Sequence, residues 1–271
     1  MRTALLRGRD HHTIGMVDVV GDAWAAAAIS IGGAPKRYAH TDPNEDAAGY
    51  CVADAGTVLV VGDAHDGFEA SEVLADHLLT HPAPQWCDAG LGIDAARWSR
   101  HVIAALCDAN EDALRESRDR GGFESSSTLT LALVRPDLGR LAYASVGDSL
   151  LLVVDADGTR EVGNASGGPG HDTFLGRRSI APDVLARRVR TGVLTLEGVE
   201  GVVAATDGLS ERGIGCEDPA AATARAADAA RGATAPVRAM TFARAVAEEA
   251  LAAQRTHGAG DNIGVAACWL P

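Results

Sequence analysis

Three strand-like runs with very short connections lie near the middle of the chain. They span Thr128–Val134, Leu141–Val146 and Leu150–Val154, and the tight turn Pro136–Gly139 joins the first two. A crossover between parallel strands needs about a dozen residues or more, so connections this short favour antiparallel pairing. The sequence therefore predicts antiparallel strands in this region.

Apolar runs on either side of these strands predict a layered fold. Short apolar runs indicate buried strands at Ala23–Ile31, Thr57–Gly62, Val199–Thr206 and Ile263–Leu270. Helical spacing of apolar residues predicts helices at Phe68–Leu79, at Asp94–Arg118 and in two parts of Pro219–Gln254. Gln85–Gly92 is expected to be a loop. Because no polar linker divides the chain, we predict one α/β or α+β domain over residues 1–271.

The charge of the chain excludes two classes of partner. There are 24 Lys and Arg residues against 37 Asp and Glu residues, which gives a formal net charge of −13. A chain this acidic lacks the basic surface that binds nucleic acids or anionic membranes. We therefore expect neither nucleic acid nor membrane as a partner.

The cysteines and the N-terminus bear on cellular location. The five cysteines are widely spaced and form no Cys-x-x-Cys pair, which favours free thiols over disulfides or a structural zinc site. Residues 1–12 contain no apolar core of signal-peptide length. The longest weakly polar run, Ala23–Ala34, is about half as long as a membrane span. We expect a cytoplasmic protein, and the sequence leaves its oligomeric state open.

Aspartates stand at the ends of several predicted strands. Asp63, Asp148 and Asp207 each follow a strand, Asp261 precedes the last strand, and Asp46 lies in a loop. A single aspartate in such a place is more often a turn residue or a helix cap. Several carboxylates at one place repel each other unless a cation neutralises them. Carboxylates without His or Cys suit hard cations such as Mg²⁺ or Mn²⁺, and two such ions can activate water against a phosphoryl group.

Six short motifs occur in the order typical of metal-dependent type 2C (PPM-type) serine/threonine phosphatases. They are Asn44–Ala47, Gly62–Gly67, Ser126–Thr128, Gly147–Ser149, Thr206–Gly208 and Gly260–Ile263. From about Tyr38 to Leu270 the chain resembles this family. The resemblance implies an α+β fold, a four-layer α-β-β-α sandwich of two antiparallel sheets flanked by helix pairs. It also implies a site for two Mn²⁺ or Mg²⁺ ions at one end of the sandwich, and a variable flap at about residues 165–190.

The resemblance also implies a set of metal ligands. Asp63 would bridge both ions, and the backbone carbonyl of Ala64 would bind one of them. Asp207 and Asp261 would hold the other ion. Asp148 matches the family's residue at a weaker third metal site.

Other residues match the family's catalytic groups. Glu45 would bind through metal-bound water, and Asp46 would orient the water network. Asn262 would support the turn that carries Asp261. The implied mechanism is attack of a metal-bridging hydroxide on a phosphate monoester. His65 would donate a proton to the leaving alcohol, although a purely structural histidine is an equal alternative.

The chain departs from the family pattern at two places. The sequence Asp63–Gly67 has Ala64 and Asp66 where the family has glycine. Asp66 is either an additional ligand or, as aspartates in turns usually are, a solvated turn residue. The family's phosphate-binding arginine is replaced by Thr41, with Lys36 and Arg37 nearby as candidate substitutes.

Three functions follow from this pattern. The first is a metal-dependent phosphatase that acts on phosphoserine or phosphothreonine in proteins. The second keeps the metal site but hydrolyses a small phosphorylated metabolite, because the usual phosphate-binding arginine is missing. The third is a catalytically weak member of the fold that binds or regulates a partner. The physiological substrate, the native metal and the role of the flap are not determined by the sequence.

Overall fold

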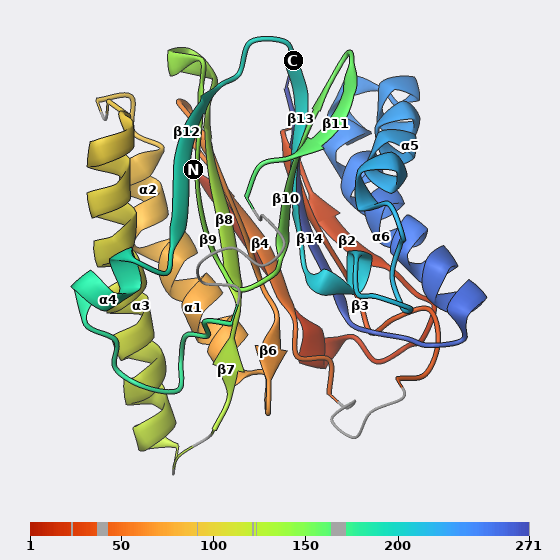
Figure 1. Cartoon of the computed structure of the whole chain (residues 1–271). Coiled ribbons are helices and arrows are strands. Elements are labelled where there is room, and N and C mark those ends of the chain that lie inside the picture. The colour runs from red at the N-terminus through yellow and green to blue at the C-terminus, as the bar shows by residue number, and fades with distance from the viewer. Residues whose placement is uncertain are drawn as a thin grey trace.

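The computed structural model describes residues 1–22, 24–36, 43–90, 92–120, 122, 124–163 and 172–270. Over these residues, two six-stranded antiparallel sheets face each other between two layers of helices (Figure 1). The architecture is the four-layer α-β-β-α sandwich that the resemblance implies.

The first sheet has the strand order β1-β4-β5-β8-β9-β12. Its strands are β1 (Arg2–Arg7), β4 (Ala47–Val52), β5 (Thr57–Gly62), β8 (Leu129–Arg135), β9 (Arg140–Val146) and β12 (Arg190–Thr195). The short hairpin β6 (Ala64–His65) and β7 (Ser126–Ser127) extends from its end.

The second sheet has the strand order β11-β10-β13-β14-β3-β2. Its strands are β2 (Asp18–Gly21), β3 (Ala25–Ser30), β10 (Leu150–Asp155), β11 (Gly158–Glu161), β13 (Val199–Ala205) and β14 (Ile263–Trp269). The segments that contribute to each sheet are therefore interleaved along the chain.

Helices cover the outer face of each sheet. The first sheet carries α1 (Glu69–Thr80), α2 (Pro82–Trp86), α3 (Ala95–Asp119) and α4 (Pro182–Ala186), and the second carries α5 (Pro219–Gly232) and α6 (Arg238–His257) (Figure 1). Single 3₁₀ turns lie at Gly8–Asp10, Pro136–Leu138, Asp207–Leu209 and Ala235–Val237. Asp94 caps α3 by accepting a hydrogen bond from the Arg97 amide, as its position in the sequence predicts.

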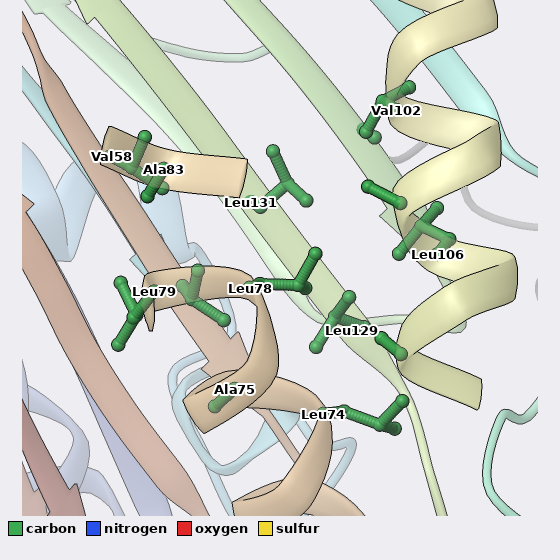
Figure 2. Packing of buried hydrophobic residues seen from close by; sticks show 14 of the residues in the cluster. Val58, Leu74, Ala75, Leu78, Leu79, Ala83, Val102, Leu106, Leu129 and Leu131 are labelled. Atoms are coloured by element: carbon green, nitrogen blue, oxygen red, sulfur yellow. The ribbon is translucent and has the colours of Figure 1, made fainter. Parts of the chain in front are cut away.

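Both faces of the central strands are buried, which explains their continuous apolar runs. In β5, Val58 and Val60 face the helices, whereas Leu59 and Val61 face the opposite sheet. Figure 2 shows leucines of α1 and α3 packed around Leu129 and Leu131 of β8. Two outer cores and one central core therefore hold the four layers together.

The antiparallel pairing of β8 with β9 is confirmed. The next strand, β10, does not continue that sheet but pairs with β11 and β13 in the other one. The chain turns at Gly147, whose φ of 90° favours glycine, and passes from one sheet to the other. The connection between β9 and β10, to which Asp148 belongs, therefore crosses between the sheets at the end of the sandwich where β6 and β7 also lie (Figure 1).

Several predicted elements match and a few do not. The strand Thr57–Gly62 has the predicted bounds, and the two helices of Pro219–Gln254 are separated near Gly232. The predicted loop Gln85–Gly92 is wrong at its start, because α2 extends to Trp86. No helix among the described residues is both long enough and apolar enough to span a membrane.

Candidate active site

Seven of the predicted site residues line one cavity of about 200 Å³ at this end of the sandwich. The lining consists of Lys36, Glu45, Asp63, Ala64, His65, Asp207, Glu211 and Asp261. The cavity thus gathers five carboxylates and one ammonium group from five separate parts of the chain. Asp148 belongs to the same cluster, since it, Asp63 and Asp207 offer carboxylate oxygens within 4.8 Å of one another.

Asp63 is held rigidly at the end of β5. Its amide donates to Thr128 Oγ1 at 3.2 Å, and its carbonyl accepts from the Thr128 amide at 2.8 Å and from Ser127 Oγ at 3.0 Å. Its carboxylate oxygen Oδ2 is buried and has no hydrogen-bond partner in the described part of the chain. A buried carboxylate oxygen without a donor is costly, so this atom is suited to a cation ligand.

The loops that carry Asp207 and Asp261 are pressed against each other. Gly208, directly after Asp207, approaches the backbone so closely that a Cβ there would lie 1.8 Å from the Asn262 carbonyl oxygen. Gly260 makes a similar approach, with a Cβ placed 1.6 Å from the Ala34 carbonyl oxygen. Gly208 therefore allows the two loops to meet, and Gly260 allows the Asp261 loop to lie against the backbone of Ala34.

Asn262 joins three segments beneath the cavity. Its side-chain oxygen accepts from the Glu45 amide at 3.1 Å and from Lys36 Nζ at 2.8 Å. Its side-chain nitrogen donates to the Ile31 carbonyl at 3.2 Å. Its own amide donates to Asp261 Oδ1 at 2.9 Å, so it fixes the Asp261 carboxylate as well as the turn.

Glu45 and Asp46 are adjacent buried residues that bond to different loops. Glu45 Oε1 accepts from the Gly67 amide at 2.6 Å, which connects it to the Asp63 loop. Asp46 Oδ2 accepts from Thr206 Oγ1 at 2.7 Å, which connects it to the residue before Asp207. These two side chains therefore link the loops of the cluster to each other.

Burial and mutual repulsion disfavour ionisation of these carboxylates. Burial, followed by repulsion from Asp207 and Asp46, raises the pKa of Asp63 well above its ordinary value. Burial, followed by repulsion from Asp261 and Asp148, does the same to the pKa of Asp207. A positive charge placed among them would lower both pKa values.

The donor set fits divalent ions that prefer oxygen. The ligands available are carboxylate oxygens and backbone carbonyls, and Asp63 contributes a buried oxygen that lacks a donor. Mg²⁺ and Mn²⁺ prefer such ligands, whereas zinc sites usually include Cys or His. The residues present therefore fit the ions that the sequence predicts.

The pH dependence of stability in the ion-free protein provides a test of this electrostatic picture. Burial, partly offset by the Thr206 hydrogen bond and by Lys36, raises the pKa of Asp46 from 3.8 to about 7. Between these two values the folded state binds more protons than the unfolded state, so the free energy of unfolding falls as pH rises through this window. We expect the Tm in EDTA to decrease from about pH 5 to about pH 7, and to decrease less in Asp46→Asn. A wild-type Tm that rises with pH, or the same dependence of Tm on pH in wild type and Asp46→Asn, would contradict the raised pKa of Asp46.

His65 and Asp66 follow the Asp63 loop out of the cavity. His65 is half exposed, and its Nδ1 lies 3.0 Å from the Ala64 carbonyl oxygen. The centroid of its ring lies 5.1 Å from that of Phe174. Asp66 has a φ of 63°, and no other non-glycine residue in the described ranges has a positive φ, so Ala64 is not strained. The Asp66 side chain is 56% exposed and lies 4.0 Å from Arg177, outside the cavity lining.

The structure describes only some of the remaining predicted residues. Arg37 and Thr41 lie outside the described residues, as do positions 164–171 at the start of the predicted flap. The described part of the flap includes Leu175, which pairs with Ser127, and α4. This part of the flap therefore lies against the hairpin that follows Asp63.

Glu211 lines the cavity but was not predicted from the sequence. Burial, followed by repulsion from Asp261 and Asp148, raises its pKa. Its amide donates to the Asp207 carbonyl at 2.6 Å in a helical turn, which brings a side chain four residues later to the same side. The four-residue spacing between Asp207 and Glu211 was the sequence signal that could have indicated Glu211 as a site residue.

Comparison with solved structures supports the fold. A serine-threonine phosphatase 2C from Toxoplasma gondii is 17% identical with a TM-score of 0.65, covering 100% of this chain and 99% of that one. A bacterial serine phosphatase is 16% identical with a TM-score of 0.64, covering 91% and 97%. The catalytic domain of the phosphatase PstP, in complex with two manganese ions, is 17% identical with a TM-score of 0.60, covering 94% and 99%. At these identities the likeness shows a shared fold.

The family follows from the sequence itself. None of the curated proteins matches this chain. Residues 35–252, most of the chain, match the family described as protein phosphatase 2C. The matched segment contains Glu45, Asp63, Asp148 and Asp207, which the structure gathers at one end of the sandwich. The chain therefore belongs to the protein phosphatase 2C family and is a phosphatase.

Proposed function

We propose that this phosphatase hydrolyses phosphoserine and phosphothreonine monoesters in proteins with the help of Mn²⁺ or Mg²⁺. The observation that supports the proposal most directly is the convergence of buried carboxylates around Asp63, whose Oδ2 atom lacks a hydrogen-bond donor. Five carboxylates around a small cavity would repel an anionic phosphate unless cations are bound among them. The two manganese ions in the PstP structure are consistent with this requirement.

We assign the ion ligands to the residues around the cavity. Asp63, Asp207 and Asp261, with the Ala64 carbonyl, would hold two ions, and Asp148 a weaker third. When bound, such ions supply positive charge for the phosphoryl oxygens and an activated water as nucleophile. Neutralisation of the cluster would also favour the ionised form of each carboxylate.

The protein contributes positioning and proton transfer. Asp46 is fixed by Thr206, so its second oxygen can orient a water molecule near the cluster. The Nδ1 atom of His65 is directed at the Ala64 carbonyl, which leaves Nε2 of the protonated ring to donate to the leaving alkoxide oxygen. The cavity is only partly exposed, so these groups act with reduced screening by water.

Lys36 is our candidate for the missing phosphate anchor. Lys36 lines the cavity, its side chain is 6% exposed, and its Nζ lies 3.1 Å from Asp261 Oδ1. A charge-assisted hydrogen bond contributes about 1.5–3 kcal/mol, so Lys36→Gln should raise KM for a phosphopeptide about 10- to 100-fold. Steady-state kinetics at saturating Mn²⁺ measures this, and Lys36→Arg should retain most of the affinity.

An alternative role for Lys36 gives a different result. If the ammonium serves only as a counter-ion for Asp261, Lys36→Gln leaves KM unchanged and alters the apparent affinity for Mn²⁺. Titration of activity against Mn²⁺ concentration separates the two roles. An unchanged KM would remove Lys36 from the proposed substrate site.

A substrate panel tests the proposed substrate class. Phosphoserine and phosphothreonine peptides should have a higher kcat/KM than sugar phosphates and nucleotides. A clear preference for a small metabolite would favour the alternative suggested by Thr41 in place of arginine. Tight Mn²⁺ binding without turnover on any phosphate ester would favour a binding or regulatory role.

A further inference from the structure

Two histidines form a pair on the helical surface, in a part of the molecule that the active site does not use. His77 lies in the last turn of α1, and His81 directly follows the helix while keeping its hydrogen bond to the His77 carbonyl. Their rings stack with centroids 4.6 Å apart and planes inclined by 16°. Both line a cavity of about 430 Å³ between α1, α2 and α3. α1 starts just after the Asp63–Gly67 loop, so about 12 Å of helix lies between its first residue and His77.

The hydrogen bonds of both rings place the proton on Nδ1. His77 Nδ1 lies 2.6 Å from Asp112 Oδ2, and a carboxylate can only accept. His81 Nδ1 lies 2.9 Å from Thr80 Oγ1, whose own hydrogen is directed at the Asp76 carbonyl at 2.7 Å. His81 must therefore be the donor in that contact. In the neutral form, both rings keep a free lone pair on Nε2.

The surroundings of the pair favour a cation. The C-terminal end of a helix carries partial negative charge, and this pair lies at the C-terminal end of α1. From α3, Asp108, Glu111 and Asp112 line the same cavity, against the single cation Arg115. Arg115 Nη1 donates a hydrogen bond to Asp112 Oδ1 at 2.6 Å, and Asp112 Oδ2 accepts from His77.

We propose that His77 and His81 bind one divalent ion of the zinc type through their Nε2 atoms. Histidines four residues apart on one helix face are a recurrent zinc-binding arrangement. Asp112 accepts a hydrogen bond from Nδ1 of His77. A carboxylate in this position fixes the orientation of the ring and raises the basicity of the ligating nitrogen. Imidazole suits Zn²⁺, Ni²⁺ and Cu²⁺, whereas the active-site carboxylates suit Mg²⁺ and Mn²⁺. Rotation of the exposed His81 side chain would bring both Nε2 atoms to one ion, and water would complete its coordination.

Calorimetric titration with Zn²⁺ tests this site. The full chain is titrated in excess Mg²⁺, which occupies the active-site carboxylates, and near-UV circular dichroism verifies the fold of each variant. We expect one Zn²⁺ site in the wild type, its loss in His77→Gln/His81→Gln, and a weakening of about 10- to 100-fold in Asp112→Asn. His12→Gln, which changes an exposed histidine elsewhere, should bind as the wild type does.

The single variant His81→Gln separates loss of a zinc ligand from loss of the fold. His81 is exposed, so its replacement should leave the fold intact while removing one of the two ligands. Zinc that binds only among the active-site carboxylates would give the same isotherm in wild type, His81→Gln and the double variant, which would overturn the proposal. Because the readout is binding of Zn²⁺ alone, the result does not depend on phosphatase activity or on the substrate.

Discussion

Asp63→Asn is expected to lower kcat for Mn²⁺-dependent hydrolysis of p-nitrophenyl phosphate by about 10³-fold or more. Asp63 contributes a buried carboxylate oxygen with no hydrogen-bond donor, at the centre of the cluster with Asp148 and Asp207. Asparagine is nearly isosteric but lacks the negative charge that would hold the ions. Divalent ions contribute several kcal/mol of transition-state stabilisation, and each 1.36 kcal/mol corresponds to about tenfold in rate.

Asp66→Asn is the matched control for this variant. Asp66 lies three residues later in the same loop, but its side chain is largely exposed and does not line the cavity. Its replacement should change kcat by less than about twofold, as expected of an exposed charge screened by solvent. Equal losses in the two variants would mean that the loop, and not the Asp63 carboxylate, accounts for the effect. Unchanged turnover in Asp63→Asn would exclude Asp63 from catalysis.

Gly208→Ala should strongly destabilise the protein. A Cβ at this position would lie 1.8 Å from the backbone carbonyl oxygen of Asn262, and backbone cannot move aside as a flexible side chain can. The loops that carry Asp207 and Asp261 must therefore separate. Overpacking of this kind costs typically about 1–3 kcal/mol, and misplacement of catalytic groups by about 1 Å can lower activity 10²-fold. Chemical denaturation and steady-state kinetics measure the two effects.

Gly232→Ala provides the comparison for Gly208→Ala. Gly232 is the last residue of α5, and a Cβ there would meet nothing within 4 Å. Alanine in a helix is up to about 1 kcal/mol more favourable than glycine, so this variant should be as stable as the wild type or more stable. If Gly208→Ala behaved in the same way, close contact between the two loops would not be needed for the site.

The site was largely predictable because its chemistry is visible at strand ends. Asp63 and Asp207 directly follow runs of buried apolar residues, so their positions were fixed once the strands were identified. What the sequence could not provide was the pairing of distant loops. The contact of Gly208 with Asn262 and the bonds of Asn262 to Lys36 and Glu45 join segments more than 50 residues apart.

The sheet edges were less predictable than the centre. Strand β1 and strand β12 were not predicted, because their residues are partly exposed and interrupted by polar or small side chains. Strand β4 is fully buried but consists mainly of Ala, Gly and Cys, which have little intrinsic strand preference. Tertiary packing between the two sheets determines its conformation. The sequence did not indicate that the chain changes sheet between β9 and β10, because a connection this short also fits a hairpin within one sheet.

The balance of charge around the cavity favours the binding of divalent ions. Without them, the cluster of carboxylates raises the pKa values of Asp63 and Asp207 through burial and mutual repulsion. With divalent ions bound, we expect the same cluster to accept an anionic phosphate ester. A crystal of the protein soaked in Mn²⁺ and measured at the manganese absorption edge tests this directly. We expect anomalous peaks between Asp63, Asp207 and Asp261, at about 2.0–2.2 Å from their carboxylate oxygens. A well-ordered site without anomalous signal at saturating Mn²⁺ would contradict it.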